Sequence, residues 1–197
     1  MNLTAFTETK FLPAARRRLK PKSCHEVERL LRAIVLPALG ARLLTSLTLA
    51  DAERLHARQT RPVQANRAHA ALSSVLSYAV RHKLIPSNPC RGVALNREHS
   101  KERFLSPAEI DRLNAAFAAS DQESDKFCQF LLLTGARPGE IQTARREWVQ
   151  GSVLRLPDAK AGARAIYLSA AALAVLDRLP PRSDGLLFTP GLDVRRA

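Results

Sequence analysis

The residues best suited to chemistry stand at a corner between two predicted helices. An apolar run, residues 130–134, ends at Gly135, which tolerates the left-handed conformation that a helix C-terminus often needs. Pro138 suits the first turn of a following helix, and Glu140 falls near the positive end of that helix. Arg137 lies between the two helices, where rigid flanks would hold its planar set of donors in the shape that binds a phosphate. The competing interpretation is an ordinary surface ion pair, because helix–glycine–helix corners are common.

A second chemically suited residue, Lys160, lies in the turn-rich segment 157–162. Short runs of strand-forming residues, 153–156 and 165–168, stand on either side of it. These runs, with the Pro and Gly between them, predict a β-hairpin that carries Lys160 at or near its tip. The sequence therefore supplies a second positive group on an element separate from the helical corner.

The rest of the second half predicts the elements that hold these groups. Ser106 and Glu109 form a capping-box pattern around Pro107, which begins a helix. The buried stripe of that helix is predicted to contain Ile110, Leu113 and Phe117. A second helix carries Phe127, Phe130, Leu131 and Leu133 to the corner, and Ser169 caps a later one. Residues 186–188 predict one more short strand.

The first half of the chain is strongly basic. Residues 1–104 hold 19 basic and 7 acidic side chains, net +12, whereas residues 105–197 hold 12 and 11, net +1. Apolar periodicity predicts one helix from about residue 25 to Gly40, a second capped by Thr48 with Asp51, and a third from about residue 63 to Ile85. The third has the clearest apolar face, made of Ala68, Leu72, Val75, Leu76, Ala79 and Val80. A net-basic helical unit is typical first of nucleic-acid binding and second of membrane-surface binding.

Three groups of polar residues in this half are candidates for contact with phosphates. The charge run 16–22 is either a solvated arm or a phosphate-binding segment. Polar side chains at the start of the third helix suit phosphate contact or plain exposure to solvent equally. The basic segment 97–104 predicts an interdomain linker that is either solvated or follows a DNA backbone. The candidates are Arg16, Arg17, Arg18 and Lys20 in the run, Gln64, Asn66 and Arg67 in the helix, and Arg97, Lys101 and Arg103 in the linker.

The composition argues against several other classes of protein. Cys24, Cys90 and Cys128 are far apart and form no C-x-x-C pair, which fits a reducing cytosol better than a disulfide framework or a zinc ribbon. The five histidines have no metal-ligand spacing. No apolar run approaches the roughly 18 residues of a membrane span, and there is no signal-peptide core. We therefore expect a cytoplasmic protein with no metal, no cofactor and no membrane partner.

The order of these motifs resembles the tyrosine recombinase, or phage integrase, family over residues 10–190. It runs from a basic helical module and linker to L-S-P-A-E, L-L-L-T-G-A-R-P-G-E-I, W-V, P-D-A-K-A-G and I-Y-L-S. The first half is similar to the core-binding domain of that family, especially in L-P-A-L-G at residues 36–40, in Asn66-Arg67 and in Asn88-Pro89. The resemblance implies a mainly α fold with a small antiparallel β-sheet. It places a helical, SAM-like core-binding domain at 1–96, a basic linker at 97–104 and the first part of an α+β catalytic domain at 105–197.

The resemblance also implies a chemistry. In the family a tyrosine attacks a DNA phosphodiester and forms a 3′-phosphotyrosyl bond, which the 5′-hydroxyl of another strand then reverses without metal or ATP. By match to the pattern T-G-x-R-x-x-E, Arg137 would stabilise charge on the non-bridging oxygens, and Glu140 would support it. Lys160 matches the lysine that protonates the leaving 5′ oxygen. The implied partner is double-stranded DNA, with self-association on paired DNA sites.

The sequence departs from the family beyond the hairpin. An H-x-x-R block, a further His or Trp and a late nucleophilic tyrosine are not found, and Tyr78 and Tyr167 are better explained as packing residues. We therefore expect a truncated chain of the site-specific recombinase type that is limited to DNA binding. Its second unit would be loosely folded or prone to association, because apolar surface stays uncovered.

Two other functions remain open. One is a non-catalytic DNA-binding protein that uses the recombinase scaffold to occupy DNA sites. The other is a basic helical interaction module unrelated to DNA. The joint presence of Arg137, Glu140 and Lys160 argues against the second of these, since such a module has no need of a lysine on a hairpin tip.

Overall fold

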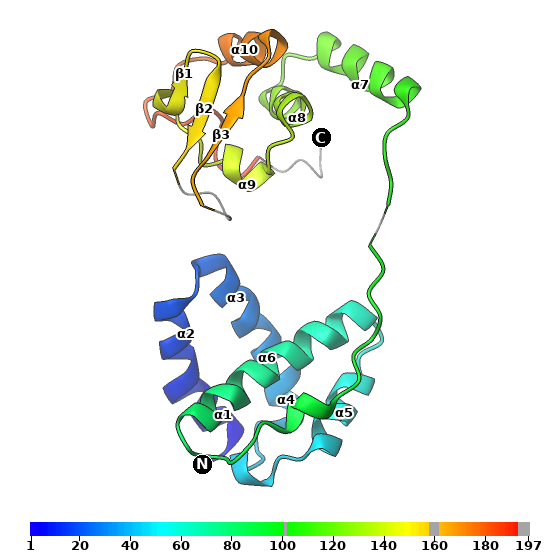
Figure 1. The fold of residues 1–197 in the computed structure, drawn as a ribbon, viewed down its shortest axis with the longest axis vertical. Helices are drawn as coiled ribbons and strands as arrows, with labels where there is room; N and C mark the ends of the chain where they lie inside the picture. Colours follow the sequence, from blue (N-terminus) through cyan, green and yellow to red (C-terminus); the bar gives the residue numbers. More distant parts are fainter. Residues whose placement is uncertain (101, 158–161, 193–197) are drawn as a thin grey trace. The chain divides into compact units, whose positions relative to one another are not determined.

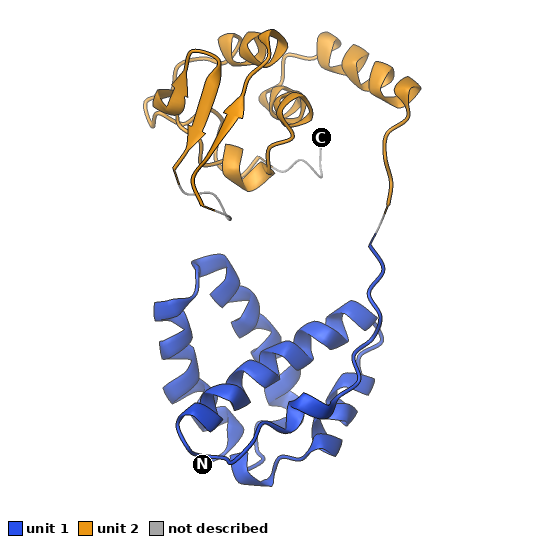
Figure 2. Cartoon of the chain, in the orientation of Figure 1, with its two compact units in different colours: residues 1–101 blue, residues 102–197 orange. Residues whose placement is uncertain are grey.

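The computed structural model describes residues 1–100, 102–157 and 162–192 (Figure 1). The chain forms two compact units, Met1–Lys101 and Glu102–Ala197, which are called unit 1 and unit 2 below (Figure 2). Lys101 and Lys160, both candidates from the sequence, lie outside the described residues. Within the described ranges, no helix combines the length and the apolar character needed to cross a bilayer.

Unit 1 is made of helices packed around one apolar core. The elements are α1 (Leu3–Phe6), a π-helical turn (Thr7–Phe11), α2 (Leu12–Arg18), α3 (Pro21–Leu30), a second π-helical turn (Leu31–Val35), α4 (Leu36–Leu39), a 3-10 turn (Leu44–Ser46), α5 (Leu49–Ala57), α6 (Pro62–Arg81) and a last 3-10 turn (Pro89–Gly92). α6 contacts both α3 and α5. Most of the predicted apolar face of α6 is confirmed: Ala68, Leu72, Val75, Leu76 and Ala79 are buried, whereas Val80 is half-buried.

The start of α5 has the predicted capping box. The Asp51 amide donates to Thr48 Oγ1 at 3.3 Å, and the Thr48 amide donates to Asp51 Oδ2 at 3.0 Å. Arg42 and Arg54 both bind the Asp51 carboxylate, which is only 3% exposed. Burial would raise the pKa of Asp51, but the hydrogen bonds from Thr48 and the two arginines outweigh it and lower the pKa. The carboxylate is therefore charged in the folded protein.

The N-terminal helical segment is not predicted from the sequence, which indicates no element before about residue 25. In the structure a helical segment begins at Leu3, and Leu3, Phe6, Phe11 and Leu12 are buried. The π-helical turn widens the helix by one residue per turn and brings Phe11 onto the core side, an arrangement that a period of 3.6 does not detect. The charge run is therefore no arm: residues 16–18 form the last turn of α2, and Pro21 begins α3.

Unit 2 combines helices with a three-stranded antiparallel sheet. The elements are α7 (Pro107–Ala119), α8 (Glu123–Thr134), α9 (Pro138–Ile141), a 3-10 turn (Arg146–Trp148), β1 (Val149–Gln150), β2 (Val153–Leu156), β3 (Arg164–Tyr167) and α10 (Ala170–Asp177). The strands lie in the order β1-β2-β3. Leu154 pairs with Ile166 and Leu156 with Arg164. The chain thus has the mainly α architecture with a small antiparallel sheet that the resemblance implies.

The core of unit 2 lies between the sheet and the helices α8 and α10. Phe127 and Phe130 of α8 pack against Phe188 with ring centroids 5.1 and 5.8 Å apart, and Leu154 and Ile166 of the sheet are buried in the same cluster. Two predictions for this unit are wrong. The stripe of α7 is only partly buried, because Phe117 is buried whereas Ile110 and Leu113 are not. Residues 186–188 form no strand but a single bridge from Leu186 to Arg145, since the buried side chains of Leu187 and Phe188 fix this segment by packing rather than by a ladder.

Candidate active site

The corner that carries Arg137 has the predicted local structure. Gly135 ends α8 with φ 60°, in the left-handed region, and its amide donates to the carbonyl of Leu131 at 2.9 Å. Pro138 is the first residue of α9, and Arg137 is the extended residue that precedes it. α9 has only four residues, shorter than the sequence suggests. The corner is therefore set by local signals, and it fixes the backbone from which the Arg137 side chain leaves.

A buried carboxylate holds the Arg137 side chain. Nη1 of Arg137 donates to Oε1 of Glu140 at 2.9 Å, while the Arg137 amide donates to Oε2 of Glu140 at 3.2 Å. The Glu140 side chain is 8% exposed and that of Arg137 is 56% exposed. One end of the guanidinium is thus anchored in the protein, and the rest of its donors face solvent. Such an anchored fork is suited to binding an anion from outside.

Arg164 is a member of the site that sequence reasoning missed. Its Nη2 lies 3.6 Å from Oε2 of Glu140, and it begins β3 opposite Leu156. The only sequence signal is its place as the first strand residue after the lysine segment. Because the sheet brings β3 against α9, Glu140 joins two arginines that lie 27 positions apart in the chain.

Glu140 carries a charge in this arrangement. Burial alone would raise the pKa of Glu140, but the hydrogen bonds from the Arg137 guanidinium and amide, together with the charge of Arg164, lower the pKa. The net result is a carboxylate that stays ionised at neutral pH and keeps both guanidinium groups in place.

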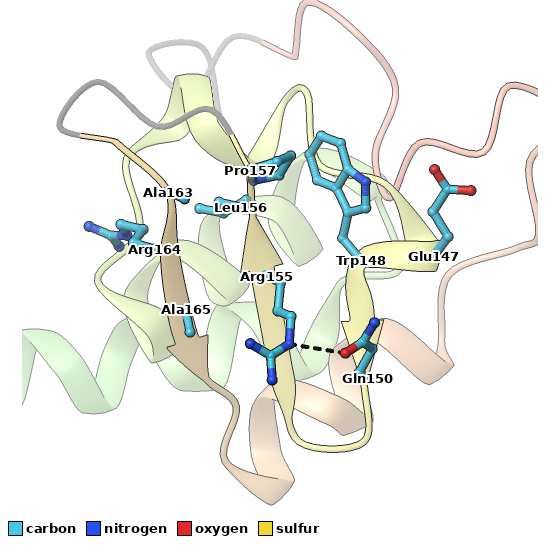
Figure 3. A pocket seen from close by; sticks show the side chains of 9 residues that line it. All are labelled: Glu147, Trp148, Gln150, Arg155, Leu156, Pro157, Ala163, Arg164 and Ala165. Carbon is cyan, nitrogen blue, oxygen red and sulfur yellow. Dashed lines mark hydrogen bonds between the residues drawn. The ribbon is translucent and has the colours of Figure 1, made fainter.

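Two cavities flank the end of the hairpin. One of about 260 Å³ is lined by Glu140, Thr143, Trp148, Leu156 and Pro157. The other, of about 410 Å³, opens on the sheet, where Trp148 stands beside Pro157 and Arg155 donates to Gln150 at 3.0 Å (Figure 3). Trp148, Leu156 and Pro157 line both, so the indole forms a wall between them. The predicted role of Lys160 stays a prediction, since that residue lies outside the described ranges.

The first group of candidate DNA-binding residues lies at the junction of α2 and α3. Arg17 and Arg18 are exposed in the last turn of α2, and Lys20 is exposed just before α3. Arg16 is also exposed, but it binds Glu28 of α3 at 2.8 Å. The structure therefore gathers four cationic side chains at one helical junction, where Arg16 forms an ion pair with Glu28.

The three candidates of the second group, at the start of α6, differ in exposure. Arg67 is exposed, close enough to Glu26 of α3 to contribute to lowering the pKa of that carboxyl, and Gln64 is half-buried. Asn66 is different, because it is only 8% exposed and its amide is bonded within unit 1. Asn66 therefore has a structural position, and we leave it out of the proposed DNA contacts.

The third group lies between the 3-10 turn Pro89–Gly92 and α7. Arg97 is fully on the surface, and Arg103 binds Glu109 of the α7 capping box at 2.6 Å. Lys101, the third member, lies outside the described residues. Arg103 is thus part of the start of unit 2, and of the two described members only Arg97 forms no ion pair.

Neither tyrosine belongs to the Arg137–Glu140–Arg164 group. Tyr78 of α6 packs against Phe6, Phe11 and His82 in unit 1. Tyr167 is 81% exposed and pairs with Val153 at the end of β3 opposite to Arg164. Strands rise by about 3.3 Å per residue, so roughly 10 Å of strand separates these two positions. Within the described ranges, no cluster of His, Cys, Asp or Glu could hold a metal ion.

Comparisons with known proteins bear on the fold. No protein-family model matches the sequence, and no curated protein does. Solved structures match with high scores. One is a lambda integrase fragment, as a dimer bound to a core site, with TM-score 0.75, 17% identity, and 91% of this chain and 69% of that chain covered. A lambda integrase tetramer bound to a Holliday junction matches with TM-score 0.77 and 16% identity. The match covers 100% of this chain and 58% of that chain.

The same fold occurs in an integrase from a transposon. The Tn1549 transposon integrase in complex with transposon right-end DNA matches with TM-score 0.77 and 18% identity, covering 96% of this chain and 70% of that chain. These identities are low, so the likeness concerns the fold. It confirms at that level the resemblance seen in the motifs: the chain has the fold of the tyrosine-recombinase integrases.

Proposed function

We propose that this chain binds double-stranded DNA and carries the phosphate-binding half of a site-specific tyrosine recombinase centre. The single observation that supports this most is that Arg137 and Arg164 share the buried carboxylate of Glu140. The integrases that share the fold are bound to DNA in their solved structures. We extend from them to this chain a partner, DNA, and a type of reaction, strand breakage and rejoining through a phosphotyrosyl bond.

In this proposal Arg137 binds the non-bridging oxygens of a scissile phosphate. Negative charge grows on these oxygens as the phosphorus takes a fifth ligand, and a donor already in place stabilises that charge without reorganising. Glu140 acts from behind by fixing the guanidinium, and Arg164 adds positive charge at the same carboxylate. Lys160 would protonate the leaving 5′ oxygen, and no metal or other cofactor takes part.

In this proposal unit 1 provides most of the affinity for duplex DNA. The candidates among the described residues of unit 1 are Arg16, Arg17, Arg18, Lys20, Gln64, Arg67 and Arg97, and the excess charge of this half supports a largely electrostatic interaction. Such contacts position a protein on DNA but carry no sequence information. Self-association on paired DNA sites is the corresponding proposal for assembly, since lambda integrase forms a dimer and a tetramer on DNA.

DNA affinity as a function of salt tests the proposed role of Arg137. In fluorescence anisotropy with a 30-base-pair duplex as probe, Arg137→Ala should lower the slope of log affinity against log salt by about 0.9, the value of one phosphate contact. Arg137→Lys should keep most of the slope. Arg155→Ala is the matched control, because that arginine lies in the same unit and donates to Gln150. Equal slopes for the wild type and Arg137→Ala would show that Arg137 binds no phosphate.

A specific observation supports the alternative of a non-catalytic DNA-binding protein. Tyr78 packs against Phe11 within unit 1, and Tyr167 lies at the end of β3 opposite to Arg164. A nicked suicide substrate separates the two functions: the 197-residue chain should form no covalent protein–DNA adduct. A phosphotyrosyl adduct mapped to Tyr167 would show that this tyrosine is the nucleophile and would end the binding-only alternative.

A further inference from the structure

Residues 93–100 are bonded to the helices of unit 1 although they form no regular secondary structure. Asn66, in the second turn of α6, holds residues 96–98. Its Nδ2 donates to the carbonyl of Asn96 at 2.8 Å and to Oε1 of Glu98 at 2.9 Å, and its Oδ1 accepts the Asn96 amide at 3.0 Å. The side-chain amide therefore binds both backbone groups of Asn96, as a neighbouring strand would.

A buried histidine completes this contact. Nε2 of His56 lies 2.9 Å from Oδ1 of Asn66, and His56 is 8% exposed. The Asn66 amide has only one orientation that satisfies Asn96 and Glu98, so Oδ1 faces the imidazole, and Nε2 of His56 also lies 3.2 Å from Nδ2 of Asn96. The Asn96 side chain in turn donates to the carbonyl of Pro62 at 3.3 Å. His56 of α5, Asn66 of α6, and Asn96 and Glu98 of the following segment thus form one hydrogen-bonded group.

Arg97 lies between the two residues that Asn66 holds. Its side chain is exposed, and within the described parts of the chain no ion pair is recorded for it. With Asn96 fixed on one side and Glu98 on the other, the backbone of Arg97 has little freedom to move. A cationic group on a fixed backbone loses less conformational entropy on binding than one on a free linker.

We propose that Asn66 is a positioning residue that presents Arg97 to a DNA phosphate. The inference rests on the proposed DNA-binding function and assigns to Asn66 a role without DNA contact. All polar atoms of Asn66 already have partners within unit 1, at distances between 2.8 and 3.0 Å. A direct phosphate contact would break at least one of these bonds, so the residue acts through the segment that it holds.

Limited trypsin digestion tests the fastening without DNA. In the wild-type chain, the Arg97–Glu98 bond should resist trypsin, since proteolysis needs a segment that can leave the protein surface. Asn66→Ala should raise its cleavage rate at least tenfold, while cleavage after Arg103 stays the same and serves as the internal standard. Glu98→Ala, which leaves α6 untouched, should raise the rate by less, and Glu98→Gln should match the wild type because it keeps the acceptor. Equal rates at Arg97 in the wild type and Asn66→Ala would overturn the proposal.

A double-mutant cycle on DNA binding tests the coupling. Arg97→Ala should lower the salt slope of log affinity by about 0.9. Asn66→Ala should lower it in the wild-type background and leave it unchanged in the Arg97→Ala background, with folding of each variant checked by circular dichroism. A full effect of Asn66→Ala in the absence of Arg97, or no effect of Arg97→Ala, would overturn the proposal while DNA binding by the remaining residues persisted. Complete lack of DNA binding by the wild type would instead overturn the proposed function, and this inference with it.

Discussion

The two units differ in the charge that they carry. Unit 1 holds nearly the whole excess of positive charge, and its core includes the buried Leu12, Leu72 and Leu76. Unit 2 is nearly neutral. Large apolar side chains are exposed in both units, for example Leu95 (56%) in unit 1 and Phe104 (88%) in unit 2. Between α7 and α8, unit 2 has an apolar groove of about 570 Å³.

This difference shows two ways of binding the same anionic polymer. Many exposed arginines on a helical core provide attraction that depends on salt and is insensitive to sequence. A single arginine fixed by a buried carboxylate provides geometry instead, as in the Arg137–Glu140 pair. We therefore propose that unit 1 provides most of the DNA affinity and that unit 2 binds the reacting phosphate. Four measurements test this difference between the units.

The largest expected effect concerns the independence of the two cores. Phe188→Ala removes a fully buried ring that packs against Phe127 and Phe130. It should lower the free energy of unfolding of unit 2 by about 3–5 kcal/mol. Thermal unfolding followed by calorimetry should show the unit 2 transition shifted and the unit 1 transition unchanged. A common shift of both transitions would mean that the units fold as one body.

The next prediction tests whether the salt dependence of DNA affinity comes mainly from the arginines of unit 1. Replacing Arg17 and Arg18 together by Ala should lower the slope of log affinity against log salt by about 1.8, since each phosphate contact contributes about 0.9. The matched control, Arg112→Ala with Arg145→Ala, removes two exposed arginines from unit 2. If the control changes the slope as much as the test pair, the salt dependence does not come mainly from unit 1.

A smaller loss of stability is expected when the hydroxyl of either capping box is removed. Thr48→Ala in unit 1 and Ser106→Ala in unit 2 remove equivalent hydroxyl caps, and each should cost about 1 kcal/mol of stability in its own unit. Chemical denaturation with a probe in each unit measures both. A loss well above this value for Thr48→Ala alone would show that the buried Asp51 network, rather than the cap, provides the stability.

The smallest effect is expected in mild acid. The pKa values of Asp51 and Glu140 are lowered by folding, so the stability that each carboxylate contributes is present above its unfolded pKa, about 3.9 and 4.3. That stability is lost as the pH falls through the lower folded values. Asp51→Asn should flatten the decline of unit 1 below about pH 4, and Glu140→Gln that of unit 2. Denaturation curves between pH 3 and 7 that stay parallel to the wild type would contradict this linkage.

Sequence reasoning succeeded where the signal is local. In the capping boxes at Thr48 and Ser106, the apolar face of α6 and the turn at Gly135, each residue acts with neighbours about one helical turn away along the chain. It failed for the N-terminal helical segment, whose π-helical turn breaks the expected period, and for residues 186–188, which packing holds in place. The role of Lys160 and the exact linker bounds stay predictions.

For the site, the sequence by itself determined which groups are available and how the corner at Arg137 is shaped, because glycine, proline and capping preferences act over a few bonds. Only the tertiary structure decided that Arg164 would share Glu140 with Arg137, and that Asn66 would hold the chain 30 residues further on instead of facing solvent. Such contacts join residues far apart along the chain. Their partners are chosen by the packing of whole elements, which no local pattern records.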